Sequence, residues 1–426
     1  MIDTTKDISV DSSVDGPELE PAPIAAPTSA RRRLSAWLVP TLLAAAVGVG
    51  VLLTAGGGSR HTVAAPIPPS TYAVPAGATV VSTPAQLIAA LAGPQADIVL
   101  ADGSYDAPTY FADSNGSRLY AQHLGGAVLT AGLVVGGNSG SGGAIVEGLA
   151  FDVSDPSKVF QGGELQTWGP SGNDLQVLDC TFDGHGVIPI GLLASTEQGL
   201  VAQRLVFSHF TDEGLRASDD ETVAYHAATP VISSISDISI DGVTRTPPGS
   251  SNGTAEAGLF IGQPVQDGVR RIRIRNVSLT GIETVNNSWD TTFSDLDIDM
   301  GGADQASGTA VYLEHFSRND VFTDFTITGA RTGFNGEWDD GTPGNAAMHD
   351  VTIEYGTIDS AGSTAAGHQA GVFLDQGSES TTVRHVTFEN QNWAGIGAYL
   401  NTGSNSFEDN TFELTPPAVD TSTDHI

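Results

Sequence analysis

A six-residue pattern recurs through most of the chain, and it constrains the fold more than any other feature. The pattern is an apolar residue, two variable residues, a small or apolar residue, one variable residue and a final apolar residue. Its copies lie about 29 residues apart on average, which is a period typical of repeat architectures. The ten copies are residues 146–151, 177–182, 202–207, 235–240, 274–279, 293–298, 322–327, 353–358, 383–388 and 407–412.

Each copy alternates apolar and polar residues, and this alternation predicts a β-strand with one buried face. Most copies are followed by a second short segment that opens with glycine, as in Gly214-Leu-Arg-Ala and Gly371-Val-Phe-Leu. The segments between copies lack the 3.6-residue period of a crossover helix, which excludes a fold that alternates strands with helices. Short strands at a fixed period therefore predict a β-solenoid.

These repeats resemble the right-handed parallel β-helix of the pectate-lyase-like superfamily. The resemblance covers about residues 79–414. A helix with Thr83 as N-cap and Pro84 in its first turn, followed by the apolar stretch 97–105, is similar to the capping helix and first coil of that superfamily. The resemblance implies an all-β parallel β-helix solenoid with a short N-terminal capping helix over residues 79–415, and it suggests that polysaccharide is the partner.

The residues before the repeats have the pattern of a membrane anchor. Residues 1–33 are polar and end in three arginines. Residues 34–55 form an uncharged apolar run, and this run is long enough to span a bilayer. The positive-inside rule then places the N-terminus in the cytoplasm. We expect a disordered cytoplasmic tail, a signal anchor at 34–55, a flexible linker at 56–78 and a disordered tail at 416–426. A cleaved signal peptide is the alternative, but the leader and apolar run exceed its usual lengths.

Charge and cysteine content exclude several classes of protein. The chain has 50 acidic and 17 basic residues, and its net charge is −33, so nucleic-acid binding through a basic face is excluded. The single cysteine, Cys180, excludes an intrachain disulfide framework. Cys180 falls at an inward position of its repeat, which predicts a buried and unreactive thiol.

The second strands predict lanes of side chains on the outside of the solenoid, because alternate residues of a strand face opposite sides. We place the residue after each strand-opening glycine inward. This register aligns Ala310 with Asn335, and it aligns Tyr312 with Glu337 and Asp375. The candidate catalytic carboxylates on the later coils are Glu314, Glu337, Asp339 and Asp375. The candidate substrate-binding residues are Tyr312, His315, Asn335, Trp338 and Tyr399, with Arg216 on an earlier coil.

Carboxylates beside aromatic rings are suited to sugars, because they accept hydroxyl hydrogen bonds while the rings provide flat apolar faces. Glu337 and Asp375, one coil apart, would lie near the separation of about 5–5.5 Å used by retaining glycosidases. The separation between Glu314 and either Glu337 or Asp339 would be wider. Crowding of the carboxylates would raise the pKa of one of them, and a carboxyl group with a raised pKa could act as a general acid. Calcium at Glu337, Asp339 and Asp375 is a second interpretation. A solvated acidic face is the third.

Other motifs point to structure. Gly184-His185-Gly186 and Asp219-Asp220 are similar to polygalacturonase motifs but occur in the reverse order, so we interpret them as coincidental. The arginines at 270–275 are expected to pair with acids of adjacent coils, with uronate binding as the alternative. We expect Asn405 and Asn410, like Asn138, to make structural hydrogen bonds at corners.

The sequence therefore predicts a single-pass type II membrane protein whose β-helix lies outside the cytoplasm and acts on or binds a polysaccharide or cell-envelope glycan. Hydrolase-like chemistry is favoured somewhat over lyase-like chemistry. No cofactor is required by the pattern, with calcium as the one candidate ion. The alternative from another class is a non-catalytic β-helix scaffold or glycan-binding protein of the cell envelope.

Overall fold

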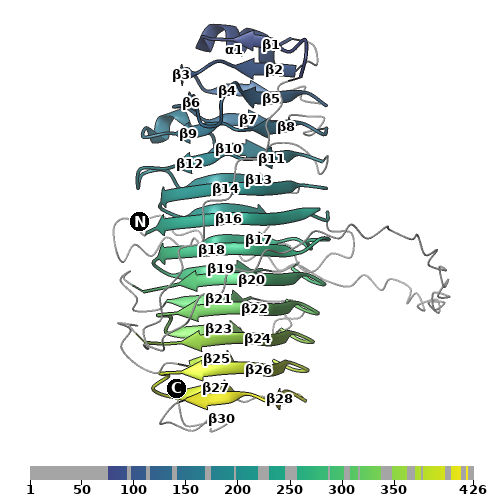
Figure 1. Cartoon of the computed structure of the whole chain (residues 1–426), viewed down its shortest axis with the longest axis vertical. Coiled ribbons are helices and arrows are strands. Elements are labelled where there is room, and N and C mark those ends of the chain that lie inside the picture. Colours follow the sequence, from purple (N-terminus) through teal and green to yellow (C-terminus); the bar gives the residue numbers. More distant parts are fainter. Residues whose placement is uncertain are drawn as a thin grey trace, which may run out of the picture. The chain divides into compact units, whose positions relative to one another are not determined.

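The computed structural model (Figure 1) describes residues 75–93, 97–111, 116–136, 142–167, 174–195, 198–218, 230–244, 257–285, 288–301, 308–314, 317–336, 348–361, 370–375, 378–398, 404–413 and 419–420. The chain divides into two compact units, Met1–Ala64 and Ala65–Ile426. All the described residues belong to the second unit. The predicted segments 1–33, 34–55 and most of 56–78 lie outside them, as do residues 421–426.

The described residues form two large sheets, one α-helix and one short 3-10 helix. The helices are α1 (Pro84–Leu91) and η1 (Pro156–Lys158). The 18-stranded sheet contains β1 (Thr79–Val81), β2 (Asp97–Leu100), β3 (Gly103–Tyr105), β5 (Arg118–Ala121), β6 (Ala127–Leu129), β8 (Ile145–Glu147), β9 (Ala150–Asp152), β11 (Gln176–Leu178), β12 (Thr181–Asp183), β14 (Val201–Phe210), β16 (Ser234–Val243), β18 (Val269–Val277), β20 (Thr292–Asp299), β22 (Val321–Thr328), β24 (Thr352–Asp359), β26 (Thr382–Glu389), β28 (Ser406–Glu408) and β29 (Thr411–Glu413). The 12-stranded sheet contains β4 (Thr109–Phe111), β7 (Leu133–Val135), β10 (Gly163–Thr167), β13 (Ile190–Ser195), β15 (Glu213–Ser218), β17 (Ala257–Gly262), β19 (Thr280–Thr284), β21 (Thr309–Leu313), β23 (Thr332–Gly336), β25 (Ala370–Leu374), β27 (Ala394–Ala398) and β30 (Val419–Asp420).

Each coil contributes to both sheets and pairs in parallel with the same segment of the next coil. In the 18-stranded sheet, Val177 pairs with Ala202 and Ala202 pairs with Ile235. In the 12-stranded sheet, Leu192 pairs with Leu215, which pairs with Leu259. Figure 1 shows the coils stacked in sequence order along the solenoid. The predicted all-β parallel β-helix is therefore confirmed.

The third residue of every repeat copy lies in the left-handed region and bends the strand of the 18-stranded sheet. Gly148 occupies this place in the first copy with φ +73°. In the other nine copies, with the fifth copy starting at Val269, φ lies between 50° and 59°, at Asp179, Arg204, Asp237, Arg271, Asp295, Asp324, Tyr355, His385 and Asp409. Glycine adopts this conformation without strain, and aspartate tolerates it better than most residues. We call this recurring place the bend position.

One of the ten predicted repeat copies was placed five residues too late. Val269 pairs with Ile235 on one side and with Phe293 on the other, so the fifth copy is 269–274 and not 274–279. The six-residue pattern fits strand β18 and the residues after it twice, at 269–274 and at 274–279, so the pattern by itself does not fix where the repeat begins. Gly268, with φ +76° at the turn before β18, marks the true start.

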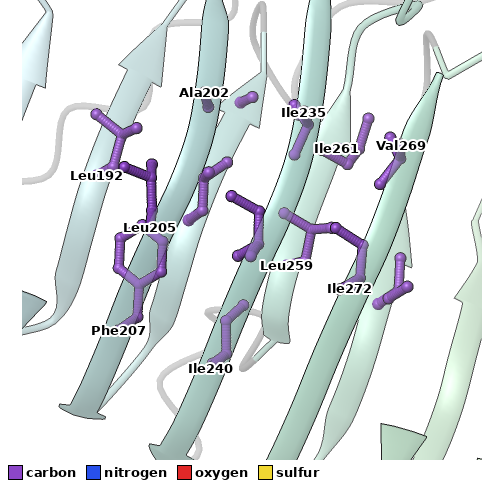
Figure 2. Close-up of a cluster of buried hydrophobic side chains, with 14 of the residues drawn as sticks. Leu192, Ala202, Leu205, Phe207, Ile235, Ile240, Leu259, Ile261, Val269 and Ile272 are labelled. Atoms are coloured by element: carbon purple, nitrogen blue, oxygen red, sulfur yellow. The ribbon is translucent and has the colours of Figure 1, made fainter. Parts of the chain in front are cut away.

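The core lies between the two sheets and is filled by the apolar residues of the repeat. Phe182 stacks on Phe151 and on Phe207, each with ring centroids 4.7 Å apart. Figure 2 shows Leu192 and Leu259 of the 12-stranded sheet among side chains of the other sheet such as Leu205. Cys180 is fully buried, which confirms its predicted inward position.

The N-terminal cap of the solenoid has the predicted form. The Thr83 Oγ1 atom accepts a hydrogen bond of 3.2 Å from the Gln86 N–H at the start of α1. In the part of the chain that the structure describes, no helix combines the length and the apolar character that a membrane span needs. The anchor expected at 34–55 lies outside that part and stays a prediction.

Candidate functional site

The outer face of the 12-stranded sheet carries one lane of side chains in strict register. Its members are Gln166, Leu193, Arg216, Phe260, Glu283, Tyr312, Asn335, Phe373 and Gly397. The sequence-based register was wrong by two residues in one coil, because Tyr312 and not Ala310 aligns with Asn335. Strand β21 has Ala310 where its neighbours have an opening glycine, so the nearby Gly308 was a misleading marker.

The early part of this lane is buried and its charges are compensated within the protein. The Arg216 guanidinium lies 4.5 Å from the centre of the Phe260 ring, and its Nη1 donates a 3.1 Å hydrogen bond to Glu213 Oε1. Burial, together with the nearby charge of Asp212, holds the pKa of Glu213 well above its ordinary value. Arg216 lies three coils from Tyr312, about 14 Å along the solenoid. The structure therefore does not bring Arg216 together with the later candidates.

The later part of the lane is half-buried and rich in aromatic rings. Tyr312, Asn335 and Phe373 follow one another on successive coils. The next lane position is Gly397, and a Cβ there would lie 2.6 Å from Cη2 of Trp393, so the indole occupies the place that a side chain would fill. The Trp393 and Phe373 ring centroids are 5.6 Å apart with a tilt of 52°. We call Tyr312, Asn335, Phe373 and Trp393 the aromatic lane.

Two of the predicted carboxylates lie beside the aromatic lane. Glu314 and Asp375 directly follow β21 and β25, and each begins the same turn, because the backbone N–H of Ser317 bonds to Glu314 O and that of Ser378 bonds to Asp375 O. Both side chains are half-buried. The two residues occupy the same strand position two coils apart, which corresponds to about 10 Å between their backbones.

The remaining predicted site residues lie outside the described part of the chain. They are Glu337, Asp339, His315, Trp338 and Tyr399. In the sequence, position 337 directly follows Gly336, which pairs with Leu313 and Leu374. Within the residues that the structure describes, no three histidine, cysteine, aspartate or glutamate side chains form a group suited to a metal ion. The calcium prediction, which needs Glu337 and Asp339, is therefore untested.

The charged groups of the other sheet pair with one another, as the sequence predicted for the arginine strand. Arg271 makes two hydrogen bonds of 2.6 and 2.7 Å with Asp237 on the preceding coil. Arg273 reaches Asp297 on the following coil at 3.2 Å. His185 bonds to Asp152 on this same sheet, away from the aromatic lane.

Trp393 and Phe373 are the residues of this site that the sequence prediction missed. The sequence contains only an indirect signal for the place of Trp393, because Gly397 is the one lane position of the later coils that has no side chain. A tryptophan four residues earlier in the chain has the size to cover that position.

No family model and no curated protein matches the sequence, whereas several solved structures match its fold. The alginate lyase AlyF-OU02 shares 13% identity over 81% of this chain and 85% of its own, with a TM-score of 0.54. A PL6 alginate lyase in complex with a trisaccharide shares 13% identity over 80% of this chain and 87% of its own, with a TM-score of 0.51. PfbA, a surface adhesin of Streptococcus pneumoniae, shares 11% identity over 79% of this chain and 87% of its own, with a TM-score of 0.50. At these identities the shared property is the fold, and the chain is a parallel β-helix protein.

Proposed function

We propose that this protein binds a polysaccharide along the aromatic lane of its later coils. The observation that carries the proposal is the row of half-buried rings on one sheet face, with the Asn335 amide between Tyr312 and Phe373 and the Trp393 indole beyond them. Aromatic rings stack against the apolar faces of sugar rings, while an amide and carboxylates bond to hydroxyl groups. The carboxylates of Glu314 and Asp375 border this row.

The structural neighbours support the same class of partner. Two of them are alginate lyases, one in complex with a trisaccharide, and the third is a surface adhesin. Within the class, the charge of this chain favours a neutral glycan. The net charge of −33 repels a polyanion, and the one described cation of the lane, Arg216, is already paired with Glu213.

Binding is tested by Trp393→Ala. We expect affinity for a neutral oligosaccharide, measured by calorimetric titration against a panel of glucan, xylan and mannan hexamers, to fall at least tenfold because the stacking face is lost. The matched control is Trp289→Ala, since Trp289 stacks under Arg318 at 4.8 Å outside the lane. Unchanged affinity in Trp393→Ala, or an equal loss in Trp289→Ala, contradicts the proposal.

Hydrolysis by Glu314 and Asp375 is the second candidate function. Inverting glycosidases hold two carboxyl groups about 6.5–9.5 Å apart with a water between them. The backbones of Glu314 and Asp375 are about 10 Å apart, and side chains that converge over the coil between them would bring the carboxyl groups into that range. A lyase mechanism is less favoured, because it needs a cation to neutralise the sugar carboxylate and Arg216 is distant.

Hydrolysis predicts that Glu314→Gln and Asp375→Asn abolish the release of reducing ends from a bound glycan while leaving its affinity within a few-fold. Glu337→Gln belongs to the same assay, run with and without calcium and a chelator. Asp152→Asn, on the other sheet, is the control and should be silent. Reducing-end release that survives both Glu314→Gln and Asp375→Asn excludes this pair as catalytic.

We further propose that residues 34–55 anchor the protein and that the β-helix lies outside the cytoplasm. The uncharged run behind Arg31, Arg32 and Arg33 supports this orientation. A non-catalytic scaffold of the cell envelope stays the alternative if no glycan is bound.

A further inference from the structure

Two exposed rings lie at the bend position of the 18-stranded sheet, on the later coils. Tyr355 and His385 stack with ring centroids 4.8 Å apart and planes 15° from parallel. Tyr355 is 52% exposed, and it is the only exposed phenylalanine, tyrosine or tryptophan among the side chains that the structure describes. The bend positions on either side are the exposed carboxylates Asp324 and Asp409.

A tyrosine at the bend position is unusual in this chain and in protein backbones generally. Bulky side chains disfavour a positive φ, and most other copies have aspartate or glycine there. The two arginines at bend positions are explained by ion pairs, because Arg204 bonds to Asp179 on the preceding coil and Arg271 bonds to Asp237. Tyr355 and His385 have no such acidic partner among the described hydrogen bonds, and they contact each other.

Stacking alone does not account for an exposed pair. The phenylalanine stacks of the core, such as Phe293 on Phe322 at 4.5 Å, bury their rings and thereby gain the hydrophobic contribution. The Tyr355 ring remains largely in water. The stack also leaves one face of each ring without an aromatic neighbour, since Tyr355 faces the coil of Asp324 and His385 faces the coil of Asp409.

The surroundings are polar and carry a net negative charge. A lane of four threonines in register runs beside the rings, formed by Thr326, Thr357, Thr387 and Thr411. On the other side, Arg384 Nε donates a 2.6 Å hydrogen bond to Glu354 Oε2. The patch therefore offers hydroxyl groups, two carboxylates and two ring faces, without an unpaired described cation to attract a polyanion.

We infer that Asp324, Tyr355, His385 and Asp409 form a second carbohydrate-binding surface, which takes pyranose units of a neutral glycan on the sheet opposite the aromatic lane. A sugar ring over Asp324 would stack on the face of Tyr355 that has no aromatic neighbour. The Asp324 carboxylate would then accept hydrogen bonds from the sugar hydroxyls. His385 and Asp409 repeat this arrangement at the other end. The coil spacing matches, because one coil step of about 4.8 Å is also a stacking distance.

The test uses the full-length chain carrying Trp393→Ala, so that binding at the aromatic lane is weakened and nitration of Tyr355 reports on its own surface. Tetranitromethane nitrates exposed tyrosines, and the modified peptide containing Tyr355 is quantified by mass spectrometry with and without the neutral hexamers. We expect a saturating glycan to slow nitration of Tyr355 at least fivefold. An alginate oligomer of equal length should protect much less.

Tyr355→Asn is the informative variant, because asparagine tolerates a positive φ. It should lower the residual affinity at least tenfold while leaving the unfolding midpoint unchanged or raised. Equal nitration with and without every glycan overturns the inference. A lowered unfolding midpoint with unchanged affinity also overturns it, since the stack would then be purely structural. Because the Trp393→Ala background separates the two surfaces, failure here leaves the aromatic lane proposal standing.

Discussion

Asp320 and Asn405 lie at the same corner of two different coils and accept the same hydrogen bond. The Thr291 N–H donates to Asp320 Oδ1 at 3.0 Å, and the Thr381 N–H donates to Asn405 Oδ1 at 2.8 Å. The Asn405 amide also donates to Ser378 O at 3.3 Å. Asp320 is fully buried, and burial raises its pKa to about 8. The corner therefore favours a neutral acceptor, which asparagine provides at every pH.

We expect Asp320→Asn to stabilise the protein at pH 8 and to change little near pH 4. The folded-state pKa of about 8 lies above the unfolded value of about 3.9, so the native state loses stability relative to the unfolded state as the pH rises between them. Each pKa unit of difference corresponds to about 1.4 kcal/mol. The free energy of unfolding of Asp320→Asn should therefore exceed that of the unchanged protein by several kcal/mol at pH 8. Urea denaturation at the two pH values measures it.

The converse variant is the matched control. Asn405→Asp places a carboxyl group at the equivalent corner, and it should introduce a smaller loss of stability with rising pH, because Asn405 is half-buried whereas Asp320 is fully buried. Equal effects of Asp320→Asn at pH 4 and pH 8 would show that the Asp320 carboxyl titrates normally.

Gly356 and Phe325 are coupled by close packing across adjacent coils. A Cβ at Gly356 would overlap the ring of Phe325, which is 3% exposed. Gly356→Ala should therefore destabilise the protein by roughly 1–3 kcal/mol, as overpacking does in other cores. Chemical denaturation measures this loss. In a Phe325→Leu background the loss should shrink, and additive effects of the two substitutions would argue against a direct contact.

Cys180 should react slowly with thiol reagents in the native protein. The side chain is fully buried, and burial raises the pKa of its thiol to about 12, so little of the reactive thiolate forms at pH 8. Labelling with a chromogenic disulfide should take hours natively and be complete within minutes in denaturant. Rapid native labelling would mean that the coil opens locally.

The proposed anchor predicts a protease-accessible β-helix on intact cells. Because three arginines precede the uncharged residues 34–55, external protease should remove the region after residue 56 and spare the cytoplasmic tail. Immunoblotting with antibodies against each end checks this. Protection of both ends would contradict the type II orientation.

The repeat could be recognised in the sequence because most coils bury the same three apolar positions. That repeat was sufficient to predict the parallel β-helix and the inward Cys180. The places of Asn405 and Asn410 near corners predicted their structural hydrogen bonds to neighbouring coils. Opposite charges at variable positions likewise predicted the ion pairs of the arginine strand. The N-terminal anchor and the residues 337–339 lie outside the described chain and stay predictions.

The alignment between coils was decided by the tertiary structure. A period of two fixes the face of a residue but leaves its register free by two residues, which is why Tyr312 was misplaced. The fifth repeat copy was started too late because the six-residue pattern fits residues 274–279 as well as residues 269–274. The corners set that register, and their lengths vary from coil to coil. The position of Trp393 over Gly397 and the burial of Arg216 against Phe260 depend on contacts between coils. The sequence therefore determined the solenoid and its buried face, whereas the contacts between coils decided which outward side chains meet.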